Sequence, residues 1–415
     1  MIELNIEILN KKTNGNELVF EIKGDNELGL PVSIINSLRR VLLSQIPTVA
    51  FRTERENNDI NITINNTSLH NEYLAHRISL IPLYLNPENF TKNYLFELKV
   101  KNKDDASFLN ITSADFNIYP IKDDVLQKAI VSDTLDSLDK ISKENYQMDK
   151  PLNKKQKDEI FKPFEFKGQK NYCLITEFKS NNSSENVEEI ELYGSPSVSI
   201  ALENTKWQAV SCASYSYKKD DELFQNILKE KIRINNIEDK DIKKYANELY
   251  ISESERYFNR DKNGNPNWFV FKLTSQHYLP SNKLFIQSNE IMKEILEEVN
   301  NEFDKFRKQE DSLINISNQK ENIFKITIEG YDDTIGNIIQ SFMTNYLIND
   351  TYIFNVCGYK KTHPLETKLL FTVSINPKNK IFTSKIEEKI YAICDAFIDV
   401  NNNLIQIFDN ISKLI

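Results

Sequence analysis

The same pattern of strand, glycine turn and amphipathic helix occurs twice in this chain, near its two ends. The first copy is LVFEIKGDNELGLPVSIINSLRRVLLSQIP, residues 18–47, and the second is IFKITIEGYDDTIGNIIQSFMTNYLI, residues 323–348. In each copy, alternating apolar residues predict a strand, a glycine predicts a turn, and apolar residues then recur at helical spacing. Each predicted helix has an apolar face to bury, which indicates an α+β fold built from two similar halves.

Both predicted helices have clear boundaries. Pro47 ends the first, and Asp332 or Asp333 supplies an N-cap for the second. Gly336 lies one turn inside the second helix, where glycine costs about 1 kcal/mol relative to alanine. We therefore expect Gly336 to allow a close helix approach at an interface between the two copies. The apolar faces are Ile34, Ile35, Leu38, Val41, Leu42 and Ile46 in the first copy, and Ile335, Ile338, Ile339, Phe342, Tyr346 and Leu347 in the second.

A long amphipathic helix is predicted at the end of each copy. The first runs from about residue 290 to residue 307, and the second starts at the capping box Ser384-x-x-Glu387. Between the copies, the polar segment QEDSLINISNQKEN, residues 309–322, predicts a linker. The two copies either pack on each other within the chain or are generic α+β units with unrelated partners, and the pattern alone leaves both possibilities open.

The first copy is interrupted by a long segment of β character. Residues 51–205 contain short apolar runs such as INITINNTSL and NYCLITEFK, which predict strands. The lysine-rich stretch from Asp149 to Lys170 predicts a solvated loop, and the charged segment 218–259 predicts helices with loops.

Charge and cysteine usage limit the classes of function. A net charge of −9 argues against a protein that binds nucleic acid strongly by itself. The four cysteines are scattered without a C-x-x-C pair, so neither a disulfide framework nor a zinc site is indicated. No apolar run approaches about 18 residues, and the first residues lack a signal-peptide pattern. We expect an intracellular soluble protein without a cofactor.

The segment HNEYLAHRISLIPLYL, residues 70–85, holds two of the four histidines. At about 100° per residue, His70 and His76 would point roughly 240° apart on a helix, whereas a zinc helix needs spacing i, i+4. A metal site is not indicated, and Pro82 ends any helix here. An alternative of another class is a hydrolase that uses His76, Glu72 and a distant cysteine such as Cys357, but no spacing supports it.

Several of these segments together resemble a known family. SIINSLRRVLLSQIPTVAF followed by LHNEYLAHRISLIPL resembles the alpha-like subunits of cellular RNA polymerases, which include the third subunit of eukaryotic polymerase II, its archaeal D-type counterpart and bacterial alpha. ENTKWQAVSCASYSY, residues 203–217, resembles the return from that family's inserted domain. The second copy is similar to the small partner of the pair, polymerase II's eleventh subunit or its archaeal L-type counterpart, through DDTIGN, GYK and HPLE in that order.

The resemblance implies an α+β fold of two alpha-like dimerisation units that pair within one chain. Each unit would be strand–helix–strands–long helix, and a mostly β inserted domain would interrupt the first. The implied boundaries are residues 1–50 and 206–311 for the first unit, 51–205 for the inserted domain, 312–322 for the linker and 323–415 for the second unit. Fused units suggest the polymerases of large DNA viruses, and intramolecular pairing rather than a homo-oligomer.

The implied function is a non-catalytic assembly subunit of a multisubunit DNA-directed RNA polymerase. Its partners would be the two large catalytic subunits and small accessory subunits, with no strong contact to nucleic acid or membrane. The implied location is the viral factory, host cytoplasm and virion, with the nucleus also possible. A dimeric adaptor unrelated to transcription is the alternative function.

The resemblance also implies site residues. The residues implied to dock to a large subunit are Arg39, Arg40, Glu72, His76, Arg77 and Trp207. The residues implied to pair the two units are Leu38, Leu42, Ile335, Gly336, Ile339 and Phe342. Because arginine can bond a carboxylate bidentately, we expect Arg40 and Arg77 to be exposed and their charge reversal to leave folding stability nearly unchanged. Ser79 stands where the family usually has glycine, and the cysteine cluster of some members is missing.

Overall fold

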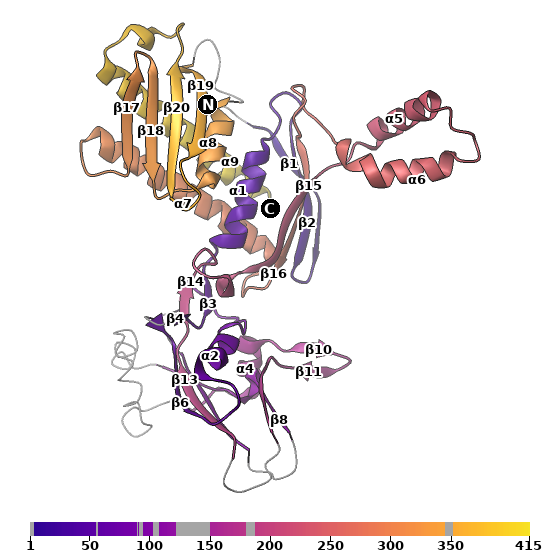
Figure 1. The fold of residues 1–415 in the computed structure, drawn as a ribbon, viewed down its shortest axis with the longest axis vertical. Coiled ribbons are helices and arrows are strands. Elements are labelled where there is room, and N and C mark those ends of the chain that lie inside the picture. The colour runs from indigo at the N-terminus through magenta and orange to yellow at the C-terminus, as the bar shows by residue number, and fades with distance from the viewer. Residues whose placement is uncertain are drawn as a thin grey trace. The chain divides into compact units, whose positions relative to one another are not determined.

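The computed structural model describes residues 4–54, 57–88, 90, 94–102, 108–121, 150–179, 187–344 and 352–415 (Figure 1). The chain divides into two compact units. The two-sheet unit consists of Met1–Leu43, Ser211–Ser275 and Ser281–Ile415, and the β-rich unit consists of Ser44–Val210 and Gln276–Pro280. Segments far apart in the sequence therefore fold together in each unit.

The first sheet of the two-sheet unit has the strand order β1-β2-β16-β15. Its strands are β1 (Ile6–Asn14), β2 (Glu17–Gly24), β15 (Val210–Tyr217) and β16 (Trp268–Ser275), and its helices are α1 (Val32–Ser44) and α7 (Ser281–Arg307). Phe20 of β2 lies opposite Phe271 of β16, and both rings pack edge-on against Phe285 of α7, with centroids 5.0 and 5.5 Å away. This aromatic cluster holds the long helix on the sheet.

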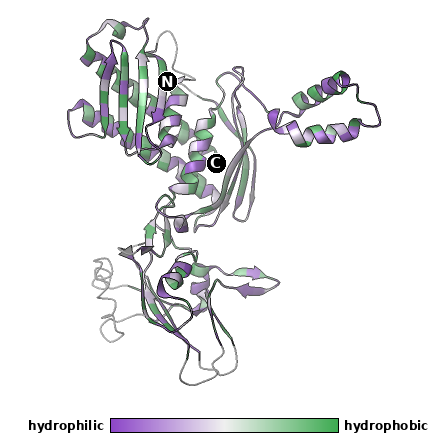
Figure 2. Ribbon diagram, viewed as in Figure 1, coloured by the Kyte–Doolittle hydropathy of each residue, from purple (hydrophilic) through white to green (hydrophobic). Residues whose placement is uncertain are grey.

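The second sheet has the strand order β17-β18-β20-β19. Its strands are β17 (Ile314–Lys320), β18 (Ile323–Glu329), β19 (Phe354–Lys361) and β20 (Lys368–Ile375), and its helices are α8 (Asp333–Phe342) and α9 (Ile386–Leu414). Hydrophobic and hydrophilic residues alternate along these strands in Figure 2. One face of the sheet is therefore apolar and must be covered by helices.

The two sheets share one topology. Along the chain, each consists of two paired strands, a helix, two further paired strands and a long helix. In space, the four strands of each sheet have the order 1-2-4-3. The predicted α+β class is confirmed, and the predicted strand, turn and helix of each copy appear in the expected order. Of the second predicted apolar face, Tyr346 and Leu347 lie outside the described residues.

A helical hairpin is inserted between β15 and β16. It consists of α5 (Asp221–Ile234) and α6 (Ile242–Glu253), as the charged segment 218–259 predicted. Phe224, Leu228 and Leu249 form its own small apolar cluster. Figure 1 shows the two helices side by side, joined by a turn at the far end.

The β-rich unit is built around the four-stranded sheet β6-β13-β7-β9. These strands are β6 (Ile60–Asn65), β7 (Tyr94–Lys101), β9 (Asn117–Pro120) and β13 (Glu189–Gly194). The other paired strands are β3 (Thr48–Ala50) with β14 (Ser197–Ser199), β4 (Thr53–Glu54) with β5 (Asn57–Asn58), β8 (Leu109–Thr112) with β12 (Leu174–Phe178), and β10 (Phe164–Phe166) with β11 (Gln169–Asn171). Helices α2 (Asn71–Ser79) and α4 (Lys154–Phe161) belong to the same unit.

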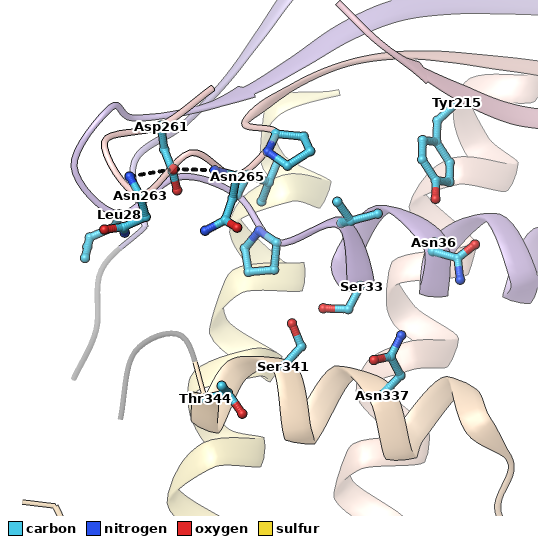
Figure 3. A pocket seen from close by; sticks show the side chains of 14 residues that line it. Leu28, Ser33, Asn36, Tyr215, Asp261, Asn263, Asn265, Asn337, Ser341 and Thr344 are labelled. Carbon is cyan, nitrogen blue, oxygen red and sulfur yellow. Dashed lines mark hydrogen bonds between the residues drawn. The ribbon is translucent and has the colours of Figure 1, made fainter. Parts of the chain in front are cut away.

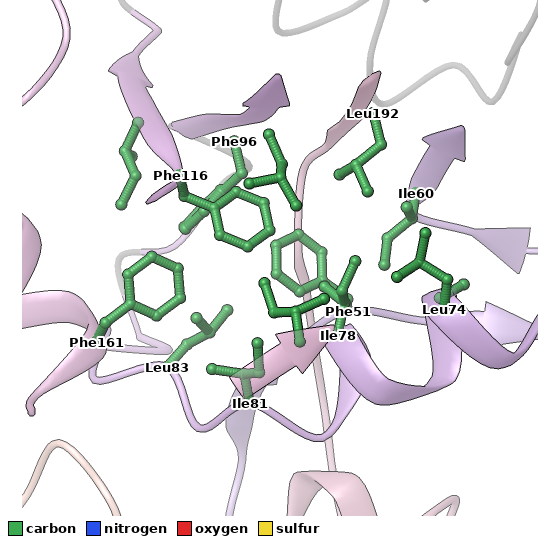
Figure 4. Packing of buried hydrophobic residues seen from close by; sticks show 14 of the residues in the cluster. Phe51, Ile60, Leu74, Ile78, Ile81, Leu83, Phe96, Phe116, Phe161 and Leu192 are labelled. Atoms are coloured by element: carbon green, nitrogen blue, oxygen red, sulfur yellow. The ribbon is translucent and has the colours of Figure 1, made fainter. Parts of the chain in front are cut away.

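The core of the β-rich unit joins these helices to the sheet (Figure 4). Phe96 of β7 packs edge-on against Phe51, Phe116 and Phe161, with ring centroids 5.2, 6.1 and 5.8 Å away. Ile78 of α2 is buried in the same cluster. The aromatic cluster therefore fixes α2 and α4 on one core. Four short 3₁₀ helices complete the described elements: Ser113–Asp115, Thr205–Trp207, Ser254–Arg256 and Lys380–Thr383.

Two segments differ from the sequence-based expectation of a linker or loop. Residues 312–322 do not form a linker, because β17 lies within them and pairs with β18. Its buried residues Ile314 and Ile316 are the only apolar positions of a strand that is otherwise polar, which made the segment look unstructured. The stretch from Lys150 to Lys170 is not a loop either, because it contains α4, β10 and β11. Asp149, at its start, lies outside the described residues.

Two helix starts also differ. Helix α7 begins at Ser281, about two and a half turns earlier than residue 290, because buried Leu284 and Phe285 extend its apolar side. Helix α9 begins at Ile386 with Lys385 in the N-cap position, so Ser384 is not the cap. In both helices, the predicted apolar side remains the side that is buried.

Candidate functional site

The two long helices of the two-sheet unit, α7 and α9, pack against each other and are called the helix seam. Lys293 forms an ion pair with Asp409 near one end of the seam, and Arg307 forms one with Asp395 (2.7 Å) near the other. Because the residue number rises along α7 while it falls along α9, the two helices are antiparallel. The buried apolar residues of the two helices include Met292, Leu296, Val299 and Phe303 of α7 and Ile393, Phe397, Val400, Leu404 and Phe408 of α9.

Polar residues also meet inside the helix seam. The amide of buried Asn401 donates to the Asn300 side-chain oxygen at 2.8 Å, and the Asn300 amide donates to Asn402 at 3.1 Å. Sliding one helix along the other would leave these amides without partners, so they specify the register of the seam. The sequence analysis missed them, because an asparagine in an amphipathic helix gives the same signal as a solvent-exposed residue.

All six residues that the sequence assigned to pairing are buried. Leu38 and Leu42 lie on α1, and Ile335, Gly336, Ile339 and Phe342 lie on α8. The apolar faces of both helices are therefore covered by other parts of the unit. Which of the five apolar side chains meets the opposite copy stays a prediction.

Gly336 does not have the role expected for it. A Cβ atom at this position would lie 2.6 and 2.7 Å from ring carbons of Tyr359 and 3.2 Å from Leu369. Tyr359 belongs to β19 and Leu369 to β20. The glycine therefore lets α8 approach the sheet of its own copy, and the prediction of a close approach between copies is wrong.

We expect Gly336→Ala to lower the free energy of unfolding by about 1–3 kcal/mol, since the added methyl group overpacks the contact with Tyr359. Gly358→Ala is the matched control, because a Cβ at Gly358 would meet nothing within 4 Å. Denaturant unfolding of both variants measures the difference. Equal midpoints for the two variants would contradict the overpacking argument.

Arg40 of α1 is bonded to the start of α8. Its Nε donates to the Thr334 hydroxyl and a terminal nitrogen donates to the Asp332 carboxylate, both at 2.8 Å. Asp332, one of the two residues predicted as candidates, is the N-cap of α8 and accepts from the Thr334 backbone N–H. Burial alone would raise the pKa of Asp332, but hydrogen bonds from Thr334 and Arg40 offset this effect and lower it.

These bonds change what is expected of the two neighbouring arginines. Because Arg40 joins the first copy to the cap of α8, reversing its charge would place two like charges together and cost folding stability. Contrary to the sequence-based expectation, we therefore expect reversal of the Arg40 charge to lower folding stability, which thermal unfolding of the variant measures. Arg39 is half-buried, and its Nε donates to the Asn36 side chain at 3.0 Å. A docking role for either arginine stays a prediction.

In the β-rich unit, α2 has one exposed face and ends as expected before Pro82. Leu74 and Ile78 point into the core, whereas Glu72 and His76 are exposed one turn apart. Tyr73 and Leu80, which are 46% and 54% exposed, flank them. We call Glu72, Tyr73, His76 and Leu80 the α2 face. An exposed aromatic residue among polar ones is typical of protein contact surfaces.

His70 is the N-cap of α2 and has a structural role. Its Nδ1 accepts a hydrogen bond from the Tyr73 backbone N–H at 3.3 Å. We expect His70→Ala to lower the free energy of unfolding of the β-rich unit by about 1 kcal/mol, whereas His70→Asn retains a cap. Thermal unfolding of the two variants measures this difference, and an unchanged melting temperature for His70→Ala would show that the cap is not used.

Arg77 is also bonded within its own unit. Its Nε donates to the carbonyl of Ile175 (2.6 Å) and a terminal nitrogen donates to that of Leu174 (3.0 Å), so the side chain ties α2 to β12. The expectation that Arg77 is free at the surface is therefore wrong. Ser79 is buried with its hydroxyl donated to the His76 carbonyl, and its backbone does not need the freedom of glycine.

Trp207 cannot take the docking role predicted for it. Its side chain is 0% exposed, so no partner can reach it without unfolding this region. The Arg52 guanidinium lies 5.2 Å and the Lys206 ammonium 4.5 Å from its ring. Trp207 is therefore a core residue that two cations cover.

The hydrolase alternative gains no support from its cysteine. Cys357 is buried against Met343, and burial raises the pKa of its thiol to about 12. Such a thiol is not ionised near neutral pH and is a poor nucleophile. Within the described ranges, three or more His, Cys, Asp or Glu side chains never gather into a possible metal site, and no helix is long and apolar enough to cross a membrane.

Comparisons with known proteins place these features in a family. The model of the RNA polymerase Rpb3/Rpb11 dimerisation domain matches residues 20–296, about two thirds of the chain. The chain is 38% identical over 105 residues to the DNA-directed RNA polymerases I and III subunit rpac1 of Dictyostelium discoideum, covering 22% of this chain and 27% of the relative.

Archaeal proteins give shorter matches. The chain is 48% identical over 56 residues to the DNA-directed RNA polymerase subunit Rpo3 of Pyrobaculum calidifontis, which covers 13% of this chain and 19% of the relative. It is 36% identical over 69 residues to Rpo3 of Methanocaldococcus jannaschii, covering 17% and 30%. The matches thus span less than a third of the length of each relative. The family match nevertheless covers most of the first sheet, α1, the β-rich unit and much of α7. This chain therefore belongs to the RNA polymerase Rpb3/Rpb11 dimerisation-domain family.

Proposed function

We propose that this chain is a non-catalytic assembly subunit of a multisubunit DNA-directed RNA polymerase. On this proposal, its two-sheet unit forms the platform on which the two large catalytic subunits and small accessory subunits assemble. Family membership supports the proposal, and so do the matched relatives, which are named as polymerase subunits. A net charge of −9 fits a subunit that contacts proteins rather than nucleic acid.

We further propose that the chain is a fusion of two alpha-like units. The observation that carries this proposal is the helix seam, in which the long helices of two sheets with the same 1-2-4-3 order pack antiparallel. The first copy would correspond to the third-subunit type and the second to its small partner, as in polymerases of large DNA viruses. The family match ends at residue 296, so the assignment of the second copy rests on its topology and motifs.

Fusion has a physical advantage for pairing. A covalent connection makes pairing intramolecular, with an effective concentration of order mM, and enforces equal amounts of the two units. The chain would then be a monomer in which the copies pair internally. On this proposal it would act inside an infected cell, in the viral factory or host cytoplasm and in the virion, with the nucleus a further compartment.

Co-purification tests the polymerase role. A tagged chain recovered from its native cells should bring down two large polymerase subunits, identified by mass, in equal amounts with the chain. Recovery of other proteins without these subunits would favour the dimeric adaptor instead.

Cleavage between the copies tests the fusion. A protease site inserted between Gln309 and Glu310 lies after α7 and before β17, so it interrupts neither element. We expect the two fragments to stay together on sizing at micromolar concentration, since obligate interfaces commonly bury more than about 2,000 Å². Separation of the fragments would contradict internal pairing.

A further inference from the structure

A polar cleft of about 480 Å³ lies in the two-sheet unit, at the start of α1. Its walls include Ser33 and Asn36 of α1, Asn337 and Ser341 of α8, and Asp261 of the loop before β16. Figure 3 shows the Ser33 side chain pointing from α1 toward Ser341 across the space between the helices. The cleft therefore lies where the first copy meets the second.

The start of α1 leaves one buried hydroxyl without a hydrogen-bond partner among the described residues. Ser33 is 8% exposed, and its buried hydroxyl has no hydrogen-bond partner within the part of the chain that the structure describes. The first turn of α1 carries no acidic residue, and its first backbone N–H groups bear the positive end of the helix dipole. A buried hydroxyl beside such a helix end is an incomplete site for an acceptor, since buried polar groups normally have partners.

Two charged groups near the cleft, the Asp261 carboxylate and the Arg39 guanidinium, limit the charge that a ligand can carry. Asp261 is held by its own loop, because its Oδ1 accepts from the backbone N–H groups of Asn263 (2.9 Å) and Asn265 (2.8 Å). Arg39 donates to Asn36 in the cleft wall, which places a positive charge at its edge. The carboxylate of Asp261 disfavours a doubly charged phosphate, whereas a carboxylate with one charge and a planar shape suits the donors that remain.

We propose that this cleft receives an Asp or Glu side chain of a partner polypeptide. The ligand carboxylate accepts from the Ser33 hydroxyl and lies at the positive end of the α1 dipole, as anions do at other helix N-termini. The Ile34 N–H is not a donor to it, because it already donates to the Pro31 carbonyl (3.1 Å). The inference rests on the proposed function, because it makes the cleft a specific contact within the assembled polymerase. It predicts that Ser33 contributes to assembly while contributing little to the folding of the free chain.

Three variants of the full chain separate these roles. Ser33→Ala removes the donor and should weaken recovery of the large subunits about tenfold, the usual effect of losing one hydrogen bond to a charged group. Ser33→Asp supplies a carboxylate from the chain itself. It should raise the melting temperature of the free chain through the helix dipole, yet weaken assembly by about a hundredfold through repulsion. Ser37→Ala is the control, because the buried Ser37 hydroxyl already donates to the Ile34 carbonyl, so its loss affects stability and not assembly.

Acetate is a direct probe of the same site. Titration of the deuterated full chain with acetate should shift the amide NMR signals of Ser33 and Ile34 in the wild type and not in Ser33→Asp. If wild type recovers the large subunits and both Ser33 variants recover them equally well, the carboxylate site is wrong while the proposed function stands. If wild type recovers none of them, the proposed function fails, and the acetate shifts alone support or reject the site.

Discussion

Phe397→Ala is expected to lower the free energy of unfolding by about 3–5 kcal/mol, the range found when a buried phenylalanine is truncated. Phe397 lies on α9, and its side chain is fully buried. Its ring lies 5.1 Å from that of Phe303 on α7 and 5.3 Å from that of Phe371 on β20, with Phe354 of β19 at 6.3 Å. One side chain thus joins the helix seam to the second sheet, and its loss leaves a cavity that both must accommodate.

The control is Tyr391→Ala, a truncation on the same helix at a position that is 46% exposed. Its effect should stay within about 1 kcal/mol, since few contacts are lost. Urea unfolding, followed by far-UV circular dichroism, gives both values from the shift in midpoint. Similar midpoints for Phe397→Ala and Tyr391→Ala would mean that the helix seam does not carry the stability assigned to it. A change of slope in Phe397→Ala would instead show that the two copies no longer unfold together.

The repeated architecture was predictable because its signals are local. Apolar residues at spacing of two or three to four residues report strands and helices directly, and Asp332 caps α8 as its position before an apolar stripe suggested. The helical hairpin α5–α6 was predictable for the same reason. In each case the residues that determine the element lie within the element.

The missed features depend on partners far away in the sequence. Strand β17 looked like a linker, since its polar residues gain structure only by pairing with β18. Nothing near Gly336 indicates that the ring of Tyr359 lies against it, and nothing near Asn300 indicates Asn401. Trp207 looked like a contact residue, but the surrounding fold buries it. A single sequence identifies which residues are apolar or charged, but tertiary structure decides what they meet.

The arginines of the candidate docking site illustrate the same limit. Arg40 donates a hydrogen bond to Asp332, which lies 292 residues later in the chain, and Arg77 donates to two carbonyl groups of β12. Both side chains therefore support the fold of their own unit. If these arginines were mutated, weaker assembly could result from lost folding stability as well as from lost docking. A test of docking therefore needs residues without such bonds.

The α2 face provides those residues. The triple variant Glu72→Ala, Tyr73→Ala, His76→Ala should change the free energy of unfolding by no more than about 1 kcal/mol, because alanine favours helices and all three side chains are exposed. Recovery of the large polymerase subunits should nevertheless fall at least about tenfold, since exposed tyrosines often carry much of the binding energy at protein interfaces. The melting temperature of the free chain and co-purification from the same cells measure the two effects separately.

Arg77→Ala is the opposite case and serves as the comparison. It removes two hydrogen bonds to the carbonyls of Leu174 and Ile175, and we expect the β-rich unit to lose about 1–3 kcal/mol of stability. Assembly should then fall only in proportion to the unfolded fraction, and lower temperature should restore it. Cooling should not restore assembly of the triple variant, because a missing contact surface is missing in the folded chain as well. If the triple variant assembles like wild type at every temperature, the α2 face is not the docking surface.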